Sequence, residues 1–571
     1  MDSIENYIEK EFGTVVKIEP IQELWSGYGQ IKRIWIANSR VKSVIVKQIS
    51  VPEKVAHPKG WNTPLSHQRK MHSYEVESYW YEHYANSSTA RLPTFYKRLH
   101  QGNSHTIVME DLDSEGLNLR LSNASIEEMK PCIEWLAKFH AKFLGTTPKG
   151  LWPVGSYWHL STRPDELEKT EGIRTKLTAA LIDKKLSKAK YQTIIHGDAK
   201  LANFCFSPDR LSVAAVDFQY VGGGCGMKDL AYFVSSCLTS DQCFELEEKI
   251  LSIYFEALKS SLDKQANFDE LEREWRQLYP YAWADFYRFL KGWSPEHWKV
   301  HEYSRQMALK AQRSVLSELL ETATGAAKLA GDIIQTSNKY KLFKKDAPSA
   351  ASEVVTEIDY KAEKAILRAL AECSNHYDFG IITEESQDDG TRFNKDYFWC
   401  VDPLDGTLAF TEGRPGHAVS IALVEKGGPP ILGVVFDPVR NNLYHATVSG
   451  GSFKNGIPFL ISKSPKSKVK LYADNSLKNE DNYEELRSTY EIHFGAGAVM
   501  NCISCIEDAP AKYIKFPKVS KGGGSIWDFA AASLIVNEAG GSATDYYGAP
   551  LDLNRKDSTY LNHRGVLISS V

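Results

Sequence analysis

An apolar run that ends abruptly in acidic residues constrains the fold of this chain more than any other feature. Residues 397–401 read Tyr-Phe-Trp-Cys-Val, which predicts a buried strand, and Asp402-Pro-Leu-Asp405-Gly-Thr follows directly. The proline fixes the backbone between the two carboxylates, and Gly406 permits a sharp turn. Crowded carboxylates repel one another unless a divalent cation lies between them. The pattern therefore predicts a hard-cation site, with an ordinary Asp-rich turn as the alternative.

Two further acid-bearing segments could reach the same point. Residues 380–386 form another apolar run that ends in Glu384, and residues 524–531 place Asp528 in a Gly-Ser-Ile-Trp-Asp-Phe-Ala-Ala segment. These separated motifs, in this order, resemble the inositol monophosphatase superfamily of magnesium-dependent phosphatases. The resemblance covers positions 316 to 571 and implies a layered αβαβα sugar-phosphatase fold.

The resemblance also implies roles for individual residues. Asp359 would pair with Thr407 and orient the attacking water, although an acid favoured by a helix N-terminus is the alternative for Asp359. The backbone N–H groups of Gly406 and Thr407 would bind phosphate oxygens. The implied Mg²⁺ ligands are Glu384, Asp402, Asp405, Asp528 and the backbone carbonyl of Leu404.

The amino-terminal half begins with a predicted sheet. Alternating apolar and polar residues between positions 14 and 49 predict three strands. The glycines Gly27 and Gly29 lie between the first two, where backbone N–H groups could approach phosphates or where only steric demands apply. Lys47 ends the third strand, and Glu77 is its candidate acidic partner, with Glu75 as the alternative.

A second acidic constellation follows in the segment Ile194-Ile195-His196-Gly197-Asp198 and beyond. Asp198 and Asn203 are five residues apart in a predicted loop, and Asp217 ends the next predicted strand. Phosphoryl transfer needs a carboxylate near the attacking hydroxyl and oxygen ligands for magnesium, which this set supplies. Two unrelated loop acids are the alternative.

These motifs resemble the aminoglycoside, choline and ecdysteroid kinase group over positions 10 to 315. The resemblance implies an α+β, protein-kinase-like bilobal fold and ATP as the phosphoryl donor. Lys47 would hold the α- and β-phosphates, Glu77 would orient Lys47, and Asp198 would be the catalytic base. Asn203 and Asp217 would bind Mg²⁺, and residues 109–112, including Met109 and Asp111, would contact adenine. Asp229 would support the catalytic loop. The aromatic residues at 279–298 are predicted to form helical core and could also line the acceptor site.

Composition limits the class of protein and its partners. The chain has 571 residues and a net charge of −4, which favours several domains and gives no indication of nucleic-acid or membrane binding. It has nine cysteines without zinc-type spacing, and the amino terminus lacks a secretory pattern. We therefore expect reduced thiols and a cytoplasmic location.

The domain boundary falls in a helical region. The helical pattern runs over 302–320 and resumes at 323–335 without a Pro/Gly/Ser-rich linker. We expect a kinase-like domain at 1–317 and a phosphatase domain at 318–571, with a homodimer through the phosphatase domain left open.

Together these motifs predict a bifunctional enzyme that uses ATP and Mg²⁺. One half would phosphorylate a small-molecule alcohol, and the other would hydrolyse a phosphate ester of the same or a related metabolite. The alternative is that one half is a binding or regulatory module for the other. Lysines at 512, 515, 518 and 521 weigh against inositol phosphate as substrate, although a solvated basic loop explains them equally well.

Overall fold

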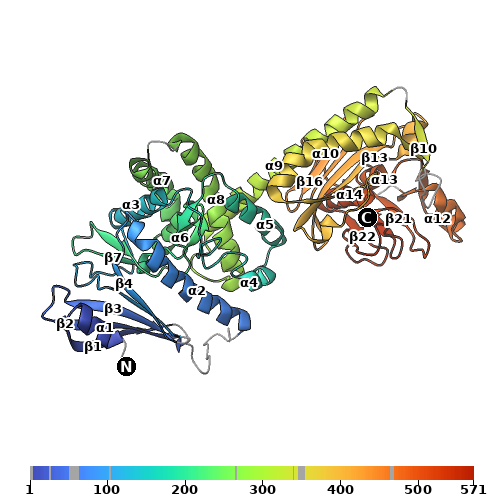
Figure 1. Ribbon diagram of the computed structural model, residues 1–571. Coiled ribbons are helices and arrows are strands. Elements are labelled where there is room, and N and C mark those ends of the chain that lie inside the picture. Colours follow the sequence, from blue (N-terminus) through green and yellow to red (C-terminus); the bar gives the residue numbers. More distant parts are fainter. Residues whose placement is uncertain are drawn as a thin grey trace. The chain divides into compact units, whose positions relative to one another are not determined.

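The computed structural model describes residues 4–24, 27–50, 63–101, 104–263, 267–337, 340–344, 354–462 and 468–571. The chain divides into two compact units, residues 1–312 and 313–571, and each is described by itself (Figure 1).

Helix α9, Glu302–Thr336, is continuous, so the predicted interruption at 321–322 is wrong. Neither Glu321 nor Thr322 prevents helical geometry, and no proline lies between 302 and 336. None of the helices in the described part of the chain is long and apolar enough to cross a bilayer.

The first unit opens with an antiparallel sheet in the order β1-β2-β3-β5-β4. Helix α1, Ile4–Glu11, packs through Ile8 on apolar side chains of β2, β3 and β5, because alternate residues of those strands face it. Helix α2, Pro64–His83, buries Glu77. The strands are β1 Thr14–Glu23, β2 Gly29–Ala37, β3 Ser43–Ile49, β4 Phe95–Gln101 and β5 Ser104–Glu110.

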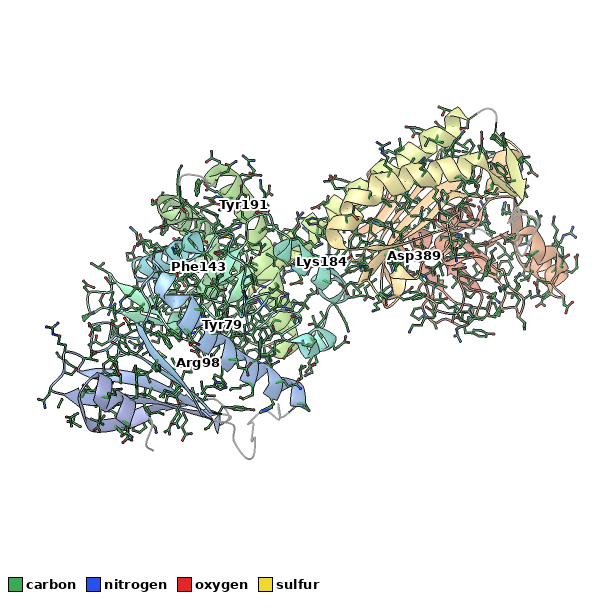
Figure 2. The ribbon with its side chains drawn as sticks, viewed as in Figure 1. Tyr79, Arg98, Phe143, Lys184, Tyr191 and Asp389 are labelled. Carbon is green, nitrogen blue, oxygen red and sulfur yellow. The ribbon has the colours of Figure 1, made fainter. Side chains whose placement is uncertain are left out.

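The rest of the first unit is mainly helical and encloses an aromatic core. Trp80 of α2 stacks on Phe218 at 5.1 Å between ring centroids and meets Phe143 at 5.4 Å; Phe143 is labelled in Figure 2. Two short ribbons, β6–β9 and β7–β8, hold the loops that carry Asp198 and Asp217. The elements are α3 Ile126–Lys142, α4 Pro164–Lys169, α5 Ile173–Ser187, β6 Thr193–Ile195, β7 Phe204–Phe206, β8 Val213–Ala215, β9 Gly222–Gly224, α6 Met227–Cys237, α7 Ser240–Ser261 and α8 Phe268–Trp293.

The second unit is layered. A seven-stranded sheet in the order β12 to β18 is antiparallel except for the parallel pair β12–β13. Helices α13 and α14 share one apolar core with this sheet and with a second sheet, ordered β20-β19-β21-β23-β22. Helix α10 packs on β13, and α12 covers β19 and β20 through a smaller cluster. The described layers are therefore helix, sheet, helix, sheet and helix.

The bounds of the second unit's elements show where its acidic residues lie. Strand β13 continues to Asp405, whereas the sequence predicted a strand ending at 401; a register shift between Asp402 and Asp405 accommodates Pro403, which cannot donate to the ladder. The elements are α10 Glu357–Tyr377, β12 Gly380–Thr383, β13 Tyr397–Asp405, α11 Thr407–Thr411, β14 Ala418–Glu425, β15 Pro430–Asp437, β16 Asn442–Thr447, β17 Gly451–Lys454, β18 Ile457–Pro458, β19 Lys470–Ala473, α12 Tyr483–Thr489, β20 Glu491–Phe494, α13 Ala498–Glu507, β21 Ala511–Lys515, α14 Ile526–Glu538, β22 Ser542–Thr544 and β23 Val566–Ser569.

Candidate active sites

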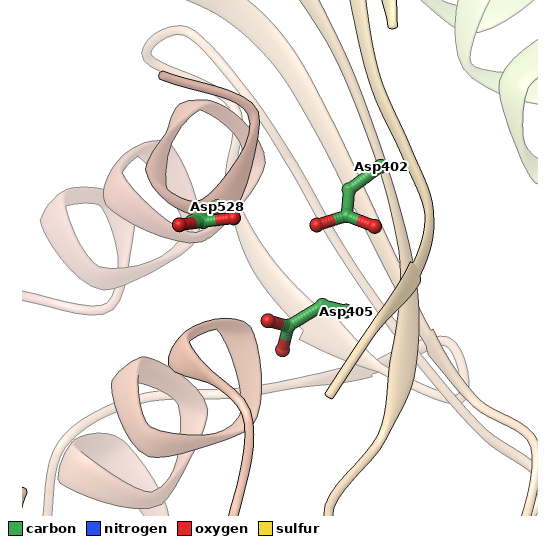
Figure 3. Close-up of side chains that lie close together, drawn as sticks. All are labelled: Asp402, Asp405 and Asp528. Carbon is green, nitrogen blue, oxygen red and sulfur yellow. The ribbon is translucent and has the colours of Figure 1, made fainter. Parts of the chain in front are cut away.

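Three acidic side chains of the second unit converge on one point. Asp402 and Asp405 lie at the end of β13, Asp528 lies in the first turn of α14, and their carboxylates face one another (Figure 3). One oxygen from each carboxylate lies within 4.8 Å of the others. Asp402 and Asp405 are only 1% and 6% exposed. The end of a buried strand and the start of a helix thus bring together residues 126 positions apart in the chain, since 528 less 402 is 126.

Backbone N–H groups fix the orientation of this acidic cluster. The two oxygens of Asp405 accept hydrogen bonds from Ala498 N at 3.1 Å and Val499 N at 2.9 Å, in the first turn of α13. Gly497 has to be glycine for this approach, because a Cβ there would lie 2.2 Å from Asp405 Oδ2. Asp528 Oδ2 accepts from Ser525 N at 2.8 Å and so caps α14.

Electrostatics and one unused acceptor indicate that the cluster fits a divalent cation. Burial, followed by the negative charges of neighbouring acids, raises the pKa of Asp402 and of Asp405 well above the ordinary value. Burial, and then Glu384, raises the pKa of Asp528 to about 7. Asp402 Oδ1 accepts from Leu404 N at 3.0 Å, whereas its buried Oδ2 has no hydrogen-bond partner among the described residues. Mg²⁺ prefers oxygen ligands, and this cluster offers closely spaced carboxylate oxygens that repel one another, one of which makes no hydrogen bond.

The two other predicted metal ligands lie beside the cluster. Glu384 follows β12, and its charge helps to raise the pKa values of Asp402 and Asp528, although its carboxylate is outside the three-acid group. The Leu404 carbonyl oxygen lies 3.1 Å from Thr407 Oγ1, whose single hydroxyl proton can go either to this carbonyl or to Asp359, so the carbonyl keeps at least one lone pair for a cation.

Asp359 and Thr407 meet as the sequence suggested. Thr407 Oγ1 lies 3.1 Å from Asp359 Oδ1, and Asp359 also accepts from the backbone N–H of Thr356 at 2.8 Å. Asp359 is thus both a helix-capping acid and the partner of Thr407. The two roles that the sequence left as alternatives for this residue are compatible. Gly406 adopts a φ of +81° and precedes the short helix α11.

Substituting Gly497, which is not one of the three acids, is expected to weaken Mg²⁺ binding by the acidic cluster. In Gly497→Ala the new Cβ would displace Asp405, so we expect the Mg²⁺ concentration for half-maximal phosphate release to rise by about 10- to 100-fold. Magnesium titration of phosphate release from a small phosphomonoester measures this. Gly325→Ala is the control, because a Cβ on Gly325 of α9 meets nothing within 4 Å. An unchanged magnesium dependence in Gly497→Ala would contradict the assignment.

The first unit contains a cavity of about 1060 Å³. Its lining includes Tyr28 but neither Gly27 nor Gly29. Gly29 instead lies against β3, where a Cβ would be 2.0 Å from the Gln48 carbonyl oxygen, which supports the steric reading of this glycine. The other predicted residues that line the cavity are Lys47, Glu77, Met109, Asp111, Asp198, Asn203 and Asp217.

Lys47 is held by two acids inside this cavity. Its Nζ lies 2.9 and 2.7 Å from the two oxygens of Glu77 and 3.4 Å from Asp217 Oδ1. The alternative partner, Glu75, has a 57% exposed side chain beside His72 and is not the partner. Burial opposes the charge of Lys47, but Glu77 and Asp217 outweigh it and hold the lysine pKa above its ordinary value.

Asp198, Asn203 and Asp217 lie around the same point. Asn203 Nδ2 donates to the Asp198 carbonyl oxygen at 2.8 Å and to Asp198 Oδ2 at 3.2 Å. The buried Oδ1 of Asp198 has no hydrogen-bond partner among the described residues. Asp217 has a φ of +72°, a conformation that costs about 1–3 kcal/mol for a residue other than glycine and is typical of functional sites. Gln219 Nε2 donates to Asp217 Oδ1 at 2.8 Å and restrains it.

Asp229 supports the loop that carries Asp198. Its carboxylate accepts from His196 N at 2.6 Å and Gly197 N at 2.9 Å, and His140 Nε2 lies 3.1 Å away. Burial opposes ionisation of Asp229, but these hydrogen bonds and histidines lower its pKa below the ordinary value. Asp229 therefore braces the loop and does not face the cavity.

Two features of the cavity were not foreseen from the sequence. Lys200 Nζ lies 3.0 Å from Asp198 Oδ2; its position two residues after Asp198 was the available signal. Both oxygens of the Asp111 carboxylate are occupied: Oδ2 accepts from Arg33 Nε and Ser43 Oγ, each at 2.6 Å, and Oδ1 accepts from Arg33 Nη2 at 3.1 Å and Asp113 N at 3.2 Å, which leaves the backbone of Asp111 for an adenine contact. Among the aromatic residues at 279–298, Phe286 and Trp293 line the cavity.

Comparison with known proteins finds two families, each matching a different region of the chain. The inositol monophosphatase family matches residues 315–570, and the ecdysteroid kinase-like family matches residues 156–267. Inositol monophosphatase 2 of Solanum lycopersicum is 31% identical over 250 residues, which cover 42% of this chain and 92% of that protein. Inositol-1-monophosphatase of Synechocystis is 32% identical over 248 residues, 42% and 83% of the two chains. A solved IMPase of Thermotoga maritima has a TM-score of 0.37 at 23% identity and covers 44% and 92%.

These matches define the class of the carboxyl-terminal region, which is an inositol monophosphatase-like phosphatase domain. The chain belongs to the inositol monophosphatase family through residues 315–570, and this region has the family's fold. Both resemblances seen in the sequence are confirmed. The ecdysteroid kinase-like match includes Asp198, Asn203 and Asp217, whereas Lys47 and Glu77 lie outside it.

Proposed function

We propose that this chain is a bifunctional enzyme. Residues 1–317 would form an ATP-dependent kinase of a small hydroxyl-bearing metabolite, with a protein-kinase-like bilobal fold, and residues 318–571 a Mg²⁺-dependent phosphomonoesterase. One observation carries the proposal: each unit buries a carboxylate oxygen without a hydrogen-bond partner among the described residues, Asp198 Oδ1 in one and Asp402 Oδ2 in the other, within a group of oxygen-bearing side chains. Bound at either group, Mg²⁺ would neutralise phosphate charge and, at the acidic cluster, acidify the attacking water.

In the phosphatase reaction, water attacks the phosphorus of a phosphate ester. A bond forms between the water oxygen and phosphorus, and the ester P–O bond breaks. Thr407 Oγ1 donates to Asp359 and thereby keeps lone pairs that accept a hydrogen bond from the water. Burial raises the pKa of Asp359, so this carboxylate is suited to take up the water proton through Thr407. The leaving alkoxide takes its proton from solvent, and the products are an alcohol and inorganic phosphate.

In the kinase reaction, the acceptor hydroxyl donates to the free Oδ1 of Asp198. The acceptor oxygen then bonds to the γ-phosphorus, the bond between that phosphorus and the β,γ-bridging oxygen breaks, and Asp198 takes the hydroxyl proton. Lys47, fixed by Glu77, would hold the α- and β-phosphates. Asn203 and Asp217 would hold Mg²⁺. The products are a phosphate ester and ADP.

The Lys47–Glu77 pair offers a test of the nucleotide site. Glu77→Gln removes the charge that orients Lys47, so we expect ADP release in the presence of an acceptor alcohol to fall by at least about tenfold. The matched control is Glu75→Gln on the same helix, where the side chain points to solvent and the rate should be unchanged. Equal rates for the two variants would show that the pair does not serve ATP.

A non-catalytic first unit is the competing interpretation, because the kinase-like match covers only residues 156–267. Mg²⁺–ATP binding by calorimetry, followed by ADP release with a panel of small alcohols, separates the two. Binding with release supports a kinase, and binding without release for any alcohol supports a nucleotide-sensing module.

A further inference from the structure

Lys299 is a buried cation that the proposed chemistry does not use. It follows α8, is 8% exposed, and lines the cavity of the first unit. Its ammonium lies 4.7 Å from the ring centroid of Tyr232 and 5.6 Å from that of Phe286, two further lining residues. The ammonium therefore rests against aromatic faces at the wall of the cavity.

The other deeply buried lysines of this unit have carboxylate partners. Lys47 contacts Glu77 at 2.7 Å, and Lys228, 1% exposed, contacts Asp285 at 3.0 Å. No carboxylate of the described residues forms such a contact with Lys299, and burial lowers its pKa to about 8 while Asp198 opposes the shift from farther away. A buried charge without a partner is costly, so a retained one is expected where a ligand supplies the opposite charge.

Lys299 is close to the reacting end of the cavity. Tyr232 interacts with both groups: its ring lies 4.7 Å from the Lys299 ammonium, and Asp198, after burial and Tyr157, raises the pKa of its hydroxyl. A small molecule whose hydroxyl reaches Asp198 Oδ1 would thus extend along Tyr232 toward Lys299.

The acids that line the cavity do not offer a site for a positively charged acceptor. Each of these acids already forms an ion pair with a basic side chain, and the one free oxygen, Asp198 Oδ1, is assigned to the acceptor hydroxyl. The pairs are Glu77 with Lys47, Glu110 with Arg91, Asp111 and Asp113 with Arg33, Asp198 with Lys200, and Asp217 with Lys47. Lys70 is a further lining cation, and no carboxylate of the described residues pairs with it.

We propose that the acceptor of the kinase reaction is an anionic alcohol, a small hydroxy acid or phosphorylated polyol, whose carboxylate or phosphate pairs with Lys299 while its hydroxyl donates to Asp198. This inference rests on the proposed kinase function and names its substrate class. It separates this chain from kinases of cationic or neutral alcohols.

Matched ligand pairs test the charge preference on the full chain. Calorimetry with Mg²⁺ and a non-hydrolysable ATP analogue present would compare gluconate with glucitol, and glycerate and glycerol 3-phosphate with glycerol, with choline as the cationic member. We expect the anionic member of at least one pair to bind at least about tenfold more tightly than its neutral partner. Preference for the neutral or cationic members, or no binding of any anionic member, would overturn the proposal.

Variants then assign the preference to Lys299. Lys299→Met keeps the apolar contact with the rings and should weaken binding of the preferred anion by about 10- to 100-fold, whereas Lys299→Arg should retain most of it. Lys259→Met is the control, because Lys259 also lies over an aromatic ring, 5.0 Å from Phe268, but does not line the cavity. Equal anion affinity in Lys299→Met and the wild type would refute the role of Lys299.

The same samples separate failure of this inference from failure of the kinase assignment. ATP binding and ADP release report on the kinase, whereas the anion preference and its loss in Lys299→Met report on the acceptor. ADP release with neutral alcohols, together with full activity of Lys299→Met, would contradict the inference about the acceptor and leave the kinase assignment standing. Absence of Mg²⁺–ATP binding would overturn both.

Discussion

Asp402→Asn is expected to abolish phosphate release while ATP-dependent ADP release continues. The asparagine keeps an oxygen for the bond from Leu404 N, but it replaces the free Oδ2 with an NH₂ group that cannot bind a cation. Losing several kcal/mol of charge stabilisation corresponds to at least about a 10³-fold lower rate. The assay is phosphate release from small phosphomonoesters with Mg²⁺.

Stability gives the same variant a second readout that does not depend on activity. The raised pKa of Asp402 means that the metal-free fold disfavours the ionised carboxylate, so a neutral asparagine should raise the melting temperature in metal-free buffer at neutral pH. Added Mg²⁺ should stabilise the wild type and not Asp402→Asn. Asp389→Asn, at an exposed site labelled in Figure 2, is the control and should behave as the wild type. Normal phosphate release by Asp402→Asn would show that the acidic cluster takes no part in the reaction.

The pH dependence of the metal-free protein follows from the same acids. The pKa of Asp528 is about 7 in the folded state and about 3.9 for an unfolded aspartate, so the folded state binds more protons between these values. The contribution of Asp528 to stability is therefore fully present below about pH 4 and lost as the pH rises to about 7.

Asp198→Asn is expected to lower ADP release by about 10²- to 10⁴-fold, the usual contribution of a general base. Asn203 Nδ2 also bonds the Asp198 backbone carbonyl, so the loop should hold its shape and Mg²⁺–ATP should still bind. Phosphate release by the other unit should not change. The control is Asp209→Asn, an exposed acid after β7 that bonds Leu211 N. ADP release at the wild-type rate would show that Asp198 is not the base.

Short-range motifs made much of both sites predictable. Asp402 and Asp405 are three residues apart at a strand end, and Asp198 and Asn203 share one loop, so their spacing in the chain fixes their proximity in space. Thr407 could be paired with Asp359 only through a family resemblance, because no local pattern joins residues 48 positions apart.

Features that depend on tertiary contacts were not predictable. The need for glycine at 497 arises from Asp405, far away in sequence, and the acid at 111 meets Arg33 through the register of a sheet. Lys299 reads as one more surface lysine until the fold buries it against Tyr232. Strand β13 is also longer than the predicted strand at 397–401, because the register shift at Pro403 lets it continue past a residue that usually ends a strand.

The most direct test of the central claim is to measure ADP release and phosphate release side by side for the full chain and for the two single variants Asp198→Asn and Asp402→Asn. The account predicts that the wild type performs both reactions, that Asp198→Asn loses only ADP release, and that Asp402→Asn loses only phosphate release. A wild type without one of the reactions, or a single variant that loses both, would contradict it.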